Sequence, residues 1–501
     1  MIENGLFMEQ GIPANESLRG DVPLLFNLQD QWLPTMNESR KQTLGYKAAV
    51  SACTILQKAG FEAYLVGGTA RDIVLGRPCP EDADVATSAE PAEFREILEK
   101  NGFMMESFGE RWGSLTGHFH GGRIEITSFR TEGRYSDKRH PDRVQFIKDY
   151  RQDALRRDFT INALYLDPLT GSVMDPVSGL KDLRSRLIRL IGDPKKRIDE
   201  DHLRMLRAVR FTSQLDFKME KNTFAAIKTR AKLIATVTGP RIKAELDKLL
   251  PGKNVMLGMR LLDETGLLRF ILPELECLKN IRHKSKRYHL EGDVYKHSLM
   301  ALSEVADSRD LDLSYAALLH DIGKATTGTE HQSPEGKIVR FKGHDSESVR
   351  LFGVIAKRLG FPRKQARTTA WLIAGNRFWP DFADLPDQRK INLVLHPSFP
   401  QLAKLWQADA NANLNLYPDG SIGPYRTTSP RDGMKLRKRA ERRKNLLDKF
   451  CDGKYLLALT RRKPGTDLGN LIRQIRIAVV RGDITTEPQL KTFLKKNIKT
   501  T

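Results

Sequence analysis

Two aspartates at alternate positions, Asp82 and Asp84 in the stretch DADVAT, have a spacing that suggests chemistry. Alternate residues of a β-strand point to the same side, so a strand here presents both carboxylates together. Carboxylate oxygens are the ligands that Mg²⁺ prefers. Glu125, in the stretch RIEITSFR, is the candidate third acid, because its strand could lie beside the first in one sheet. The acids predict a two-metal magnesium site that activates an attacking hydroxyl and stabilises a departing pyrophosphate in nucleotidyl transfer.

A glycine pair, Gly67 and Gly68, stands before the aspartates in the stretch VGGTARD, together with Arg71. Glycine lets backbone N–H groups approach a triphosphate closely, and an arginine can neutralise its charge. An Asp-x-Asp alone is common on protein surfaces, but Gly-Gly-x-x-Arg-Asp shortly before it is a far more specific pattern. The stretch therefore predicts one half of a site for a nucleotide and its metal ions.

The elements that must position these residues are short strands and helices. Helical periodicity runs over 38–60 and 91–102, and strand patterns cover 62–68 and 123–130. The first 170 residues therefore combine helices with strands. From residue 199 onward almost every periodic stretch is helical, so the remainder is predicted to be nearly all α.

The composition favours a large protein with a polyanionic partner. The chain has 501 residues, 40% of them hydrophobic, which is enough for several cores. Lys and Arg number 83 against 62 Asp and Glu, a net charge of +21 that favours nucleic acid, with solubility as the alternative reading. The four cysteines form no C-x-x-C pair, and no leader or membrane-spanning stretch is evident, so we expect a soluble protein of the reducing cytoplasm.

Four motifs occur in a characteristic order: LVGGTARDIVLG with DADVAT, then RRDFTINAL, DPVSGLKDL and DEDHLRMLRAVRF. In this order they resemble the bacterial tRNA nucleotidyltransferase and poly(A) polymerase family, in particular its CCA-adding branch, over about residues 45–280. The resemblance implies an α+β fold, in which a nucleotidyltransferase head related to DNA polymerase beta, with a mixed sheet and helices, precedes an all-α neck, HD-type body and tail. We divide the chain into an N-terminal extension, head, neck, body and basic tail over 1–45, 46–175, 176–255, 256–425 and 426–501.

The resemblance also implies an enzyme that adds C, C and A to the tRNA 3′ end from CTP and ATP. In the stretch EDHLR, Asp201 and Arg204 are three residues apart, which places them side by side on a predicted helix. Asp201 can accept from the exocyclic amino group of cytosine or adenine while Arg204 donates to the ring nitrogen, and uracil and guanine present a carbonyl instead. The alternative is an ordinary intrahelical ion pair worth about 0.2–0.5 kcal/mol.

Further arginines follow from the same resemblance. Arg207 and Arg210 continue the predicted helix and correspond to the family's triphosphate contacts. Arg157 corresponds to a nucleotide contact, and its neighbours Arg156, Asp158 and Asn162 would orient the ribose or brace the strand. The polar segment 131–146 is expected to be a mobile loop that couples nucleotide choice to the position of the RNA end.

A second set of residues suits a divalent transition metal: His297, His320 and Asp321, in the stretches HLEGDVYKHS and LLHDIGK. They resemble the HD phosphohydrolase signature, for which Asp409 is the candidate last ligand and His344 a candidate ligand for a second metal. HD domains hydrolyse phosphoesters, including 2′,3′-cyclic phosphates, but the scaffold also occurs without activity. An active site here would activate water against a phosphate at an RNA end.

Several readings stay open at the level of sequence. The chain could add only CC or only A, or act as a poly(A) polymerase on many RNAs. It could also be an HD phosphohydrolase whose head merely binds RNA, although intact acids and arginines in the head argue against that reading. The basic run 431–447 is either a solvated helix face or an RNA contact. In the leading reading, the basic neck, body and tail bind the tRNA acceptor arm through phosphate and shape contacts.

Overall fold

The computed structural model describes residues 43–106, 110–133, 143–282, 287–333, 336–460 and 464–498. They belong to two compact units, Met1–Gly192 and Asp193–Thr501. Residues 1–42 of the predicted N-terminal extension and 134–142 of the predicted mobile loop lie outside the described residues. The finer boundaries between neck, body and tail stay predictions.

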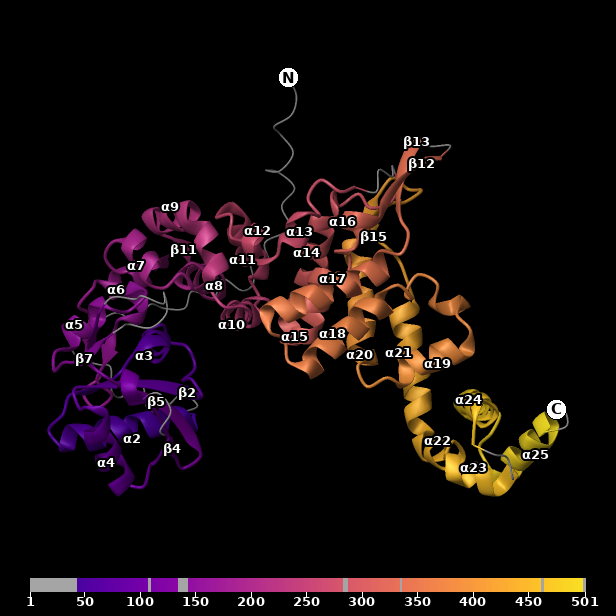
Figure 1. The fold of residues 1–501 in the computed structure, drawn as a ribbon, viewed down its shortest axis with the longest axis horizontal. Coiled ribbons are helices and arrows are strands. Elements are labelled where there is room, and N and C mark those ends of the chain that lie inside the picture. The colour runs from indigo at the N-terminus through magenta and orange to yellow at the C-terminus, as the bar shows by residue number, and fades with distance from the viewer. Residues whose placement is uncertain are drawn as a thin grey trace. The chain divides into compact units, whose positions relative to one another are not determined.

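The first unit is built on a seven-stranded mixed sheet of order β3-β4-β5-β2-β1-β8-β9 (Figure 1). The β2–β5 pairing is parallel, and the other pairings of this sheet are antiparallel. Its strands are β1 (Ala63–Leu65), β2 (Asp82–Thr87), β3 (Met104–Glu106), β4 (Ser114–Phe119), β5 (Gly122–Ser128), β8 (Tyr165–Leu166) and β9 (Val173–Met174). The unit also contains α2 (Leu44–Lys58), α3 (Gly67–Val74), α4 (Pro91–Lys100), η2 (Glu110–Trp112), β6 (Arg130–Glu132), β7 (Val144–Phe146), α5 (Tyr150–Leu155), η3 (Thr160–Asn162), α6 (Gly179–Arg184) and β10 (Leu187–Ile188).

Helix α2 supports the three central strands of the sheet. It begins after Thr43, whose hydroxyl accepts from the Tyr46 N–H, and it contacts β1, β2 and β5. Gly45 leaves no room for a side chain, because a Cβ there would lie 1.6 Å from the Glu81 carbonyl oxygen. Strand β5 alternates between buried and exposed residues through most of its length, as its sequence predicts. The chain leading into β2 is thereby held directly against the first turn of α2.

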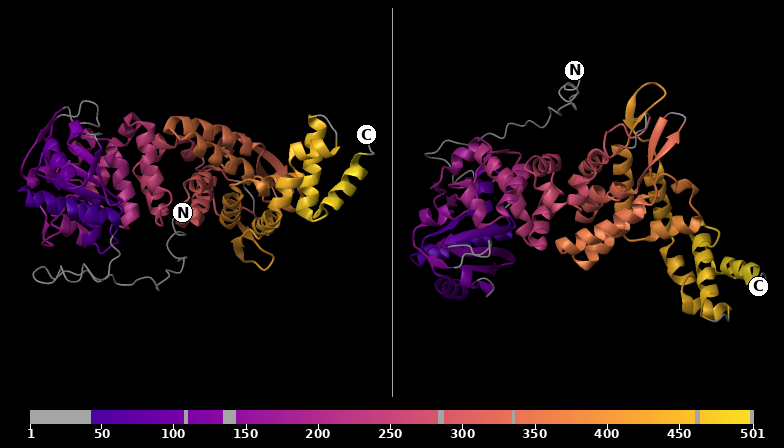
Figure 2. Two further views of the ribbon diagram at one scale, coloured as in Figure 1. Left: turned by 90° about the horizontal axis from the view of Figure 1, so that it is seen from below. Right: turned by 45° about the horizontal axis from the view of Figure 1, so that its top comes forward.

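The second unit is almost entirely helical, as the sequence predicts. The neck and body comprise α7 (Pro194–Glu200), α8 (Arg204–Leu215), β11 (Lys218–Met219), α9 (Lys221–Arg230), η4 (Ala231–Thr236), α10 (Gly239–Leu249), α11 (Val255–Glu264), α12 (Leu268–Ile271), α13 (Pro273–Glu276), α14 (Val294–Val305), η5 (Ala306–Ser308), α15 (Leu311–Leu319), α16 (Lys324–Thr327), α17 (His344–Leu359), α18 (Arg363–Asn376), η6 (Phe382–Asp384), α19 (Asp387–Leu395) and α20 (Phe399–Ala412). Two hairpins interrupt the helices: β12 (Gly328–Ser333) with β13 (Gly336–Phe341), and β14 (Leu414–Leu416) with β15 (Ile422–Pro424). Figure 2 shows both projecting from the helical body.

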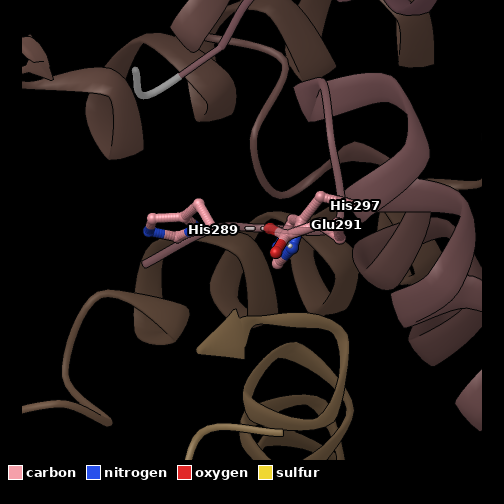
Figure 3. A group of neighbouring side chains, drawn as sticks. All are labelled: His289, Glu291 and His297. Carbon is pink, nitrogen blue, oxygen red and sulfur yellow. Dashed lines mark hydrogen bonds and ion pairs between the residues drawn. The ribbon is translucent and has the colours of Figure 1, made fainter. Parts of the chain in front are cut away.

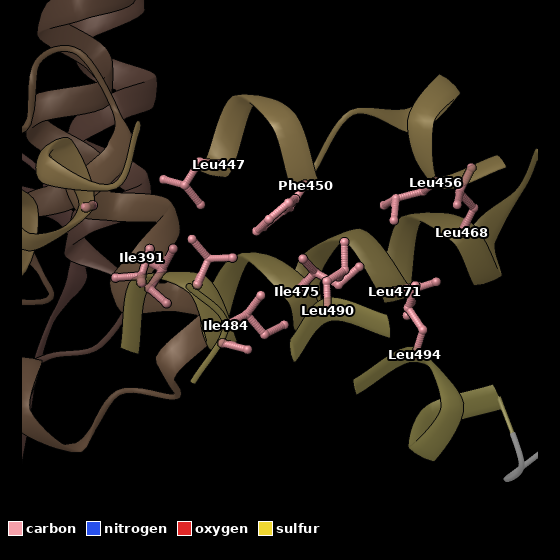
Figure 4. Packing of buried hydrophobic residues seen from close by; sticks show 14 residues of the cluster. Ile391, Leu447, Phe450, Leu456, Leu468, Leu471, Ile475, Ile484, Leu490 and Leu494 are labelled. Carbon is pink, nitrogen blue, oxygen red and sulfur yellow. The ribbon is translucent and has the colours of Figure 1, made fainter. Parts of the chain in front are cut away.

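The C-terminal helices share a hydrophobic cluster that includes Phe450, Ile475 and Leu490 (Figure 4). These helices are α21 (Ser429–Arg442), α22 (Lys444–Phe450), α23 (Gly453–Thr460), α24 (Thr466–Arg481) and α25 (Glu487–Ile498). The basic run 431–447 forms α21 and the start of α22, and one of its arginines, Arg443, donates to the carbonyl oxygens at the end of α24. At least one arginine of the basic run therefore stabilises the packing of the C-terminal helices. Among the described residues, no helix is long and apolar enough to cross a membrane.

Candidate active sites

The predicted acids of the head lie on two paired strands. Asp82 and Asp84 are on β2 and Glu125 is on β5, and the parallel register places Asp84 opposite Glu125. Asp82 is opposite Arg123, and their side chains form an exposed ion pair at 3.3 Å. The prediction that the strand of Glu125 lies beside that of the aspartates is thus confirmed, and alternate positions put Asp82 and Asp84 on the same side of β2.

Asp84 has an environment that disfavours its charge. Burial, together with the negative charge of Glu125, raises the pKa of Asp84 to about 6, although Arg157 and Arg71 act in the opposite direction. Like charges on neighbouring carboxylates disfavour ionisation of both, and a bound cation would offset that repulsion. Carboxylate oxygens suit a hard divalent cation, so the donor types of these residues fit Mg²⁺.

The glycine pair begins helix α3 directly against this carboxylate. Gly67 has a φ of 61°, in the left-handed region, and a Cβ at this position would lie 2.9 Å from Asp84 Oδ2. The Thr69 hydroxyl accepts from the Asp84 N–H at 2.9 Å. The turn and the strand are therefore fixed to each other, and only glycine satisfies both the backbone conformation and the close approach.

Replacing Gly67 by alanine is expected to abolish nucleotide incorporation, because the new methyl group displaces the Asp84 carboxylate. Gly60→Ala is the matched control: Gly60 also has a positive φ, 90°, but a Cβ there meets nothing within 4 Å. Both variants carry the backbone strain of a left-handed residue, and only Gly67→Ala carries the clash. Incorporation assays on both, with thermal unfolding as a check on folding, separate the two effects; equal losses in the two variants would contradict this account.

Arg71 is held by the motif RRDFTINAL. Its Nη1 donates to Asn162 Oδ1 at 2.7 Å, and Nε and Nη2 donate to Asp72 at 2.9 Å. Asn162 in turn donates to Asp158 Oδ1 at 3.2 Å. Arg71 is only 6% exposed, so its guanidinium is oriented rather than free to move. Asn162 and Asp158 thus hold Arg71, whereas the sequence predicted that they orient the ribose or brace the strand.

Asp153, which sequence analysis missed, organises the two arginines of the same motif. Its fully buried carboxylate accepts from Arg156 Nε at 2.8 Å, from Arg157 Nη2 at 3.0 Å and from the Tyr165 hydroxyl at 2.6 Å. Burial alone would raise the pKa of Asp153, but the two guanidinium groups and the hydroxyl hold it well below its usual range. Arg157 is therefore oriented by a buried anion. The spacing of Asp153 from Arg156 and Arg157, three and four residues, is the signal in the sequence that could have identified it.

The predicted continuous helix over 199–211 is wrong, because the chain breaks at Asp201. Helix α7 ends at Glu200, Asp201 has extended backbone angles, and α8 begins at Arg204. Asp201 Oδ1 accepts from the Leu203 N–H at 3.1 Å, a local bond by which aspartate competes with a helix. Its carboxylate also accepts from Arg241 Nη2 at 3.0 Å, so its closest cation comes from α10 rather than from Arg204.

The three arginines of α8 lie on one helix, as predicted, but in different surroundings. Arg204 donates to Glu200 at 2.5 Å, and it is 6% exposed. Arg210 is 5% exposed and pairs with Glu245 of α10, whereas Arg207 is less buried and lies 3.7 Å from Glu245. Arg210 is thus part of the packing between α8 and α10. The predicted nucleotide contacts of these residues stay predictions.

The HD residues converge in the second unit. His297 is on α14, His320 and Asp321 follow α15, and Asp409 is on α20. His297 Nε2 lies 3.0 Å from Asp409 Oδ1 and 3.7 Å from Asp321 Oδ2, and His320 Nε2 lies 3.3 Å from Asp321 Oδ2 and 3.8 Å from Asp409 Oδ1. All four residues are buried. Two imidazole nitrogens and two carboxylates at these separations fit a divalent transition metal.

The hydrogen bonds of the histidines direct their other nitrogens into this cluster. His320 Nδ1 donates to the Ala317 carbonyl at 2.9 Å, so in the neutral ring Nε2 carries no proton. Nε2 is buried and makes no hydrogen bond to a described residue, although Asp321 Oδ2 lies 3.3 Å from it. His344 Nδ1 likewise donates to the Phe341 carbonyl at 2.6 Å, and its Nε2 lies 3.5 Å from Asp321 Oδ1. Such outer partners are typical of metal-binding histidines. His344 is thus close enough to Asp321 to share a second metal.

Residues that the sequence did not identify complete the cluster. Asp409 Oδ2 accepts from Asn376 at 2.5 Å and from the Trp379 indole at 2.9 Å, and Lys324 Nζ lies 2.7 Å from Asp321. His320, Asp321 and Asp409 line a cavity of about 480 Å³, with Lys324, Arg340 and Arg377 as its cationic residues. A cavity with clustered metal ligands and basic side chains suits a phosphoester.

Three protein families match the chain in sequence order. Residues 63–189 match the poly A polymerase head domain, and residues 216–278 match the probable RNA and SrmB- binding site of polymerase A. Residues 294–398 match the HD domain. The HD match ends before Asp409, so the inclusion of that residue in the cluster rests on the structure.

Curated relatives and solved structures agree with these matches. The CCA-adding enzyme of Ligilactobacillus salivarius is 44% identical over 269 residues, 54% of this chain and 65% of that protein. That of Lacticaseibacillus paracasei is 43% identical over 225 residues, 45% of this chain and 55% of that protein. The matches thus span less than two thirds of these relatives.

Over nearly the whole chain, the fold resembles that of CCA-adding enzymes. A crystal structure of the Bacillus stearothermophilus enzyme in complex with CTP aligns with a TM-score of 0.66 at 23% identity, over 92% of this chain and 99% of that one. The Thermotoga maritima enzyme complexed with tRNA aligns with a TM-score of 0.56 at 19% identity, over 92% and 97%. The chain thus matches, in order, a poly A polymerase head domain, a probable RNA-binding site of polymerase A and an HD domain, and it is similar to CCA-adding enzymes in sequence and in its α+β fold.

Proposed function

We propose that this protein is a template-independent tRNA nucleotidyltransferase that adds C, C and A to the tRNA 3′ end from CTP and ATP. The observation that carries the proposal is the register of the head sheet, which sets Asp84 opposite Glu125 beside the Gly67 turn. The relatives named as CCA-adding enzymes, and the similar structures with CTP and with tRNA, support the choice of substrates. A tRNA substrate supports the cytoplasm as the place of this activity.

In this proposal the residues of the head bind the triphosphate and the metal ions. Asp82, Asp84 and Glu125 would hold Mg²⁺, which when bound stabilises the charge that develops on the phosphoryl oxygens. Gly67 and Gly68 bring backbone N–H groups close to the phosphates, and Gly67 does so without displacing Asp84.

Several arginines are candidates for binding the phosphates of the nucleotide. Arg71 and Arg157 act on the Asp84 carboxylate electrostatically and are themselves fixed, the first by Asn162 and the second by Asp153. Fixed cations bind a polyanion with little loss of side-chain entropy. Arg207, the least buried of the three α8 arginines, is the residue of that helix best suited to contact phosphate.

Base selection falls to Asp201 and Arg204 in this proposal. The break in the helix leaves Asp201 as a carboxylate acceptor between α7 and α8, braced by Arg241 rather than by its neighbour. A fixed carboxylate accepts from the amino group of cytosine or adenine and leaves the carbonyl of uracil or guanine unpaired. The test is incorporation on a tRNA transcript that lacks CCA: CTP and ATP should be used, and UTP and GTP rejected.

We further propose a metal-dependent phosphohydrolase at the HD cluster, because four buried ligands and Lys324 line or adjoin one cavity. A divalent metal there would be held by His297, His320, Asp321 and Asp409, and it would supply a metal-activated water. Lys324, Arg340 and Arg377 would bind the phosphate oxygens. An HD scaffold without activity is the alternative. The observation that favours activity is that the ligand cluster opens onto a cavity lined with cationic side chains.

Replacing His320 by alanine is expected to remove metal binding at this cluster and hydrolysis of 2′,3′-cyclic AMP while leaving nucleotide incorporation unchanged. The reason is that His320 Nε2 is a buried ligand atom without another partner among the described residues. Incorporation and hydrolysis are measured on the same preparation, with His331→Ala, an exposed histidine of the β12–β13 hairpin, as the matched control. Hydrolysis that persists in His320→Ala would assign it to another site or to a contaminant.

A further inference from the structure

Glu291 is a buried acid beside the HD cluster, and the proposed functions give it no role. Its side chain is 2% exposed. Its Oε2 accepts from the Leu414 N–H at 2.9 Å, while Oε1 lies 3.2 Å from His289 Nδ1 and 3.1 Å from His297 Nδ1. Figure 3 shows the carboxylate between the two imidazole rings. A single anion is therefore fixed by the backbone of β14 and faces two histidines.

The position of Glu291 affects which ring nitrogen of His297 carries the proton and which is available to a metal. Asp409 Oδ1 lies 3.0 Å from His297 Nε2, and Glu291 Oε1 lies 3.1 Å from His297 Nδ1, so each ring nitrogen faces one carboxylate. In a neutral imidazole the single proton goes to the nitrogen that faces the acceptor. A metal that displaces the Nε2 proton therefore finds the remaining proton held at Nδ1 by Glu291, and a carboxylate at this place also makes Nε2 more electron-rich.

We infer that Glu291 is a positioning residue, which holds His297 in the orientation and tautomer that bind a divalent metal through Nε2. This inference rests on the proposed metal-dependent function of the HD cluster. The Nδ1 of His320 faces the neutral carbonyl oxygen of Ala317. Of these two histidines, only His297 therefore has a carboxylate as the partner of its Nδ1.

The same three residues are poorly suited to a metal site of their own. An ion bound between Glu291 and His297 Nδ1 would compete with the HD cluster for one imidazole, which would have to lose both protons to serve two metals. One oxygen of Glu291 is also engaged by Leu414. Support of His297 by Glu291 requires only the observed approach of Oε1 to Nδ1, at 3.1 Å.

The experiment measures Co²⁺ binding to the full-length chain by visible absorption and calorimetry. Asp82→Asn and Asp84→Asn are present throughout, so that the acids of the head do not contribute, and His320→Ala supplies the background. Glu291→Gln, whose carbonyl oxygen can still accept from Leu414, is expected to weaken the Kd about 10- to 100-fold, the usual effect of losing an outer partner. His289→Ala removes the other imidazole that Glu291 faces and is expected to leave the Kd unchanged.

A double-mutant cycle separates positioning from a general structural role. If Glu291 acts through His297, Glu291→Gln adds no further loss of Co²⁺ affinity in a His297→Ala background. An additional loss of the same size there, or an unchanged Kd in Glu291→Gln alone, would overturn the inference. A chain with His297 and Glu291 intact that bound no more Co²⁺ than the His320→Ala background would refute the proposed HD function, and the inference with it. Co²⁺ binding above that background with a Kd that Glu291→Gln leaves unchanged would refute the inference alone.

Discussion

Asp84→Asn is expected to lower nucleotide incorporation at least about 10³-fold, because a catalytic metal supplies several kcal/mol and each 1.36 kcal/mol is a factor of ten in rate. Asparagine keeps the shape of the side chain and removes the charge that a divalent cation needs. The fold should not suffer, since burial and Glu125 raise the pKa of Asp84 to about 6, which means that its ionised form is disfavoured in the folded head. Incorporation of labelled CTP into a tRNA transcript without CCA measures the effect.

The matched control for Asp84→Asn is Glu106→Gln. Glu106 is an exposed acid on β3 of the same sheet, where it pairs with His118 at 2.7 Å, and its loss should leave incorporation at the wild-type rate. Thermal unfolding in EDTA checks that both variants are folded. If Asp84→Asn kept activity within tenfold of wild type, the acids of β2 and β5 could not be the metal ligands of the reaction.

Asp153→Ala is expected to destabilise the head by about 3–5 kcal/mol, the usual cost of removing one partner from a buried ion pair. The change leaves Arg156 and Arg157 without their shared carboxylate. Hydrogen exchange resolved by peptide should show faster exchange in β2 and β5 and no change in α14 or α20 of the second unit. Asp149→Asn, which keeps the N-cap acceptor of α5, is the control and should stay within about 0.5 kcal/mol. Unaltered exchange in the head of Asp153→Ala would refute this role.

The stabilisation from Asp153 should also depend on pH. Its pKa is depressed in the folded head, so the ionised form stabilises the fold. That contribution is fully present above the unfolded pKa of about 3.9 and is lost as the pH falls toward the lower folded value. The stability difference between wild type and Asp153→Asn should therefore shrink as the pH is lowered below about 4. An undiminished difference would mean that another group controls the effect.

The placement of the three acids of the head was predictable because it follows local rules. Alternation places Asp82 and Asp84 on one side of a strand, and the half-buried pattern around Glu125 marks another strand of the same small sheet. Gly67 was predictable as a tight turn. Its contact with the Asp84 carboxylate was not, because that distance depends on how α3 leaves β1.

The break at Asp201 shows where the local rule fails. Helical spacing of the apolar residues continues through the stretch, but Asp201 bonds the Leu203 N–H and is also bound by Arg241, which belongs to a later helix. Periodicity describes which face is apolar and says nothing about a side chain that competes for backbone hydrogen bonds.

The supporting residues of both sites were missed for a related reason. Asp153, Glu291 and Asn376 are single polar residues without a motif, and their importance comes from burial beside charged partners. Asp153 and Glu291 contact residues of their own segments, and Asn376 contacts Asp409 on another helix. Metal ligands recur in recognisable patterns, whereas the groups that orient them depend on the packing of particular helices. Asp409 was a candidate ligand from the sequence resemblance, but its contact with His297 depends on the packing of α20 against α14.

The most direct test of the central claim is the length of the products. The purified protein is incubated with Mg²⁺ and tRNA transcripts that end before CCA, after CC or with intact CCA, and CTP and ATP are supplied separately and together. Growth to CCA followed by a stop, lost in the Asp84→Asn variant, is the predicted result. Addition restricted to C or to A would indicate a partial enzyme, and long A tails would indicate a poly(A) polymerase. No incorporation on any transcript would contradict the account.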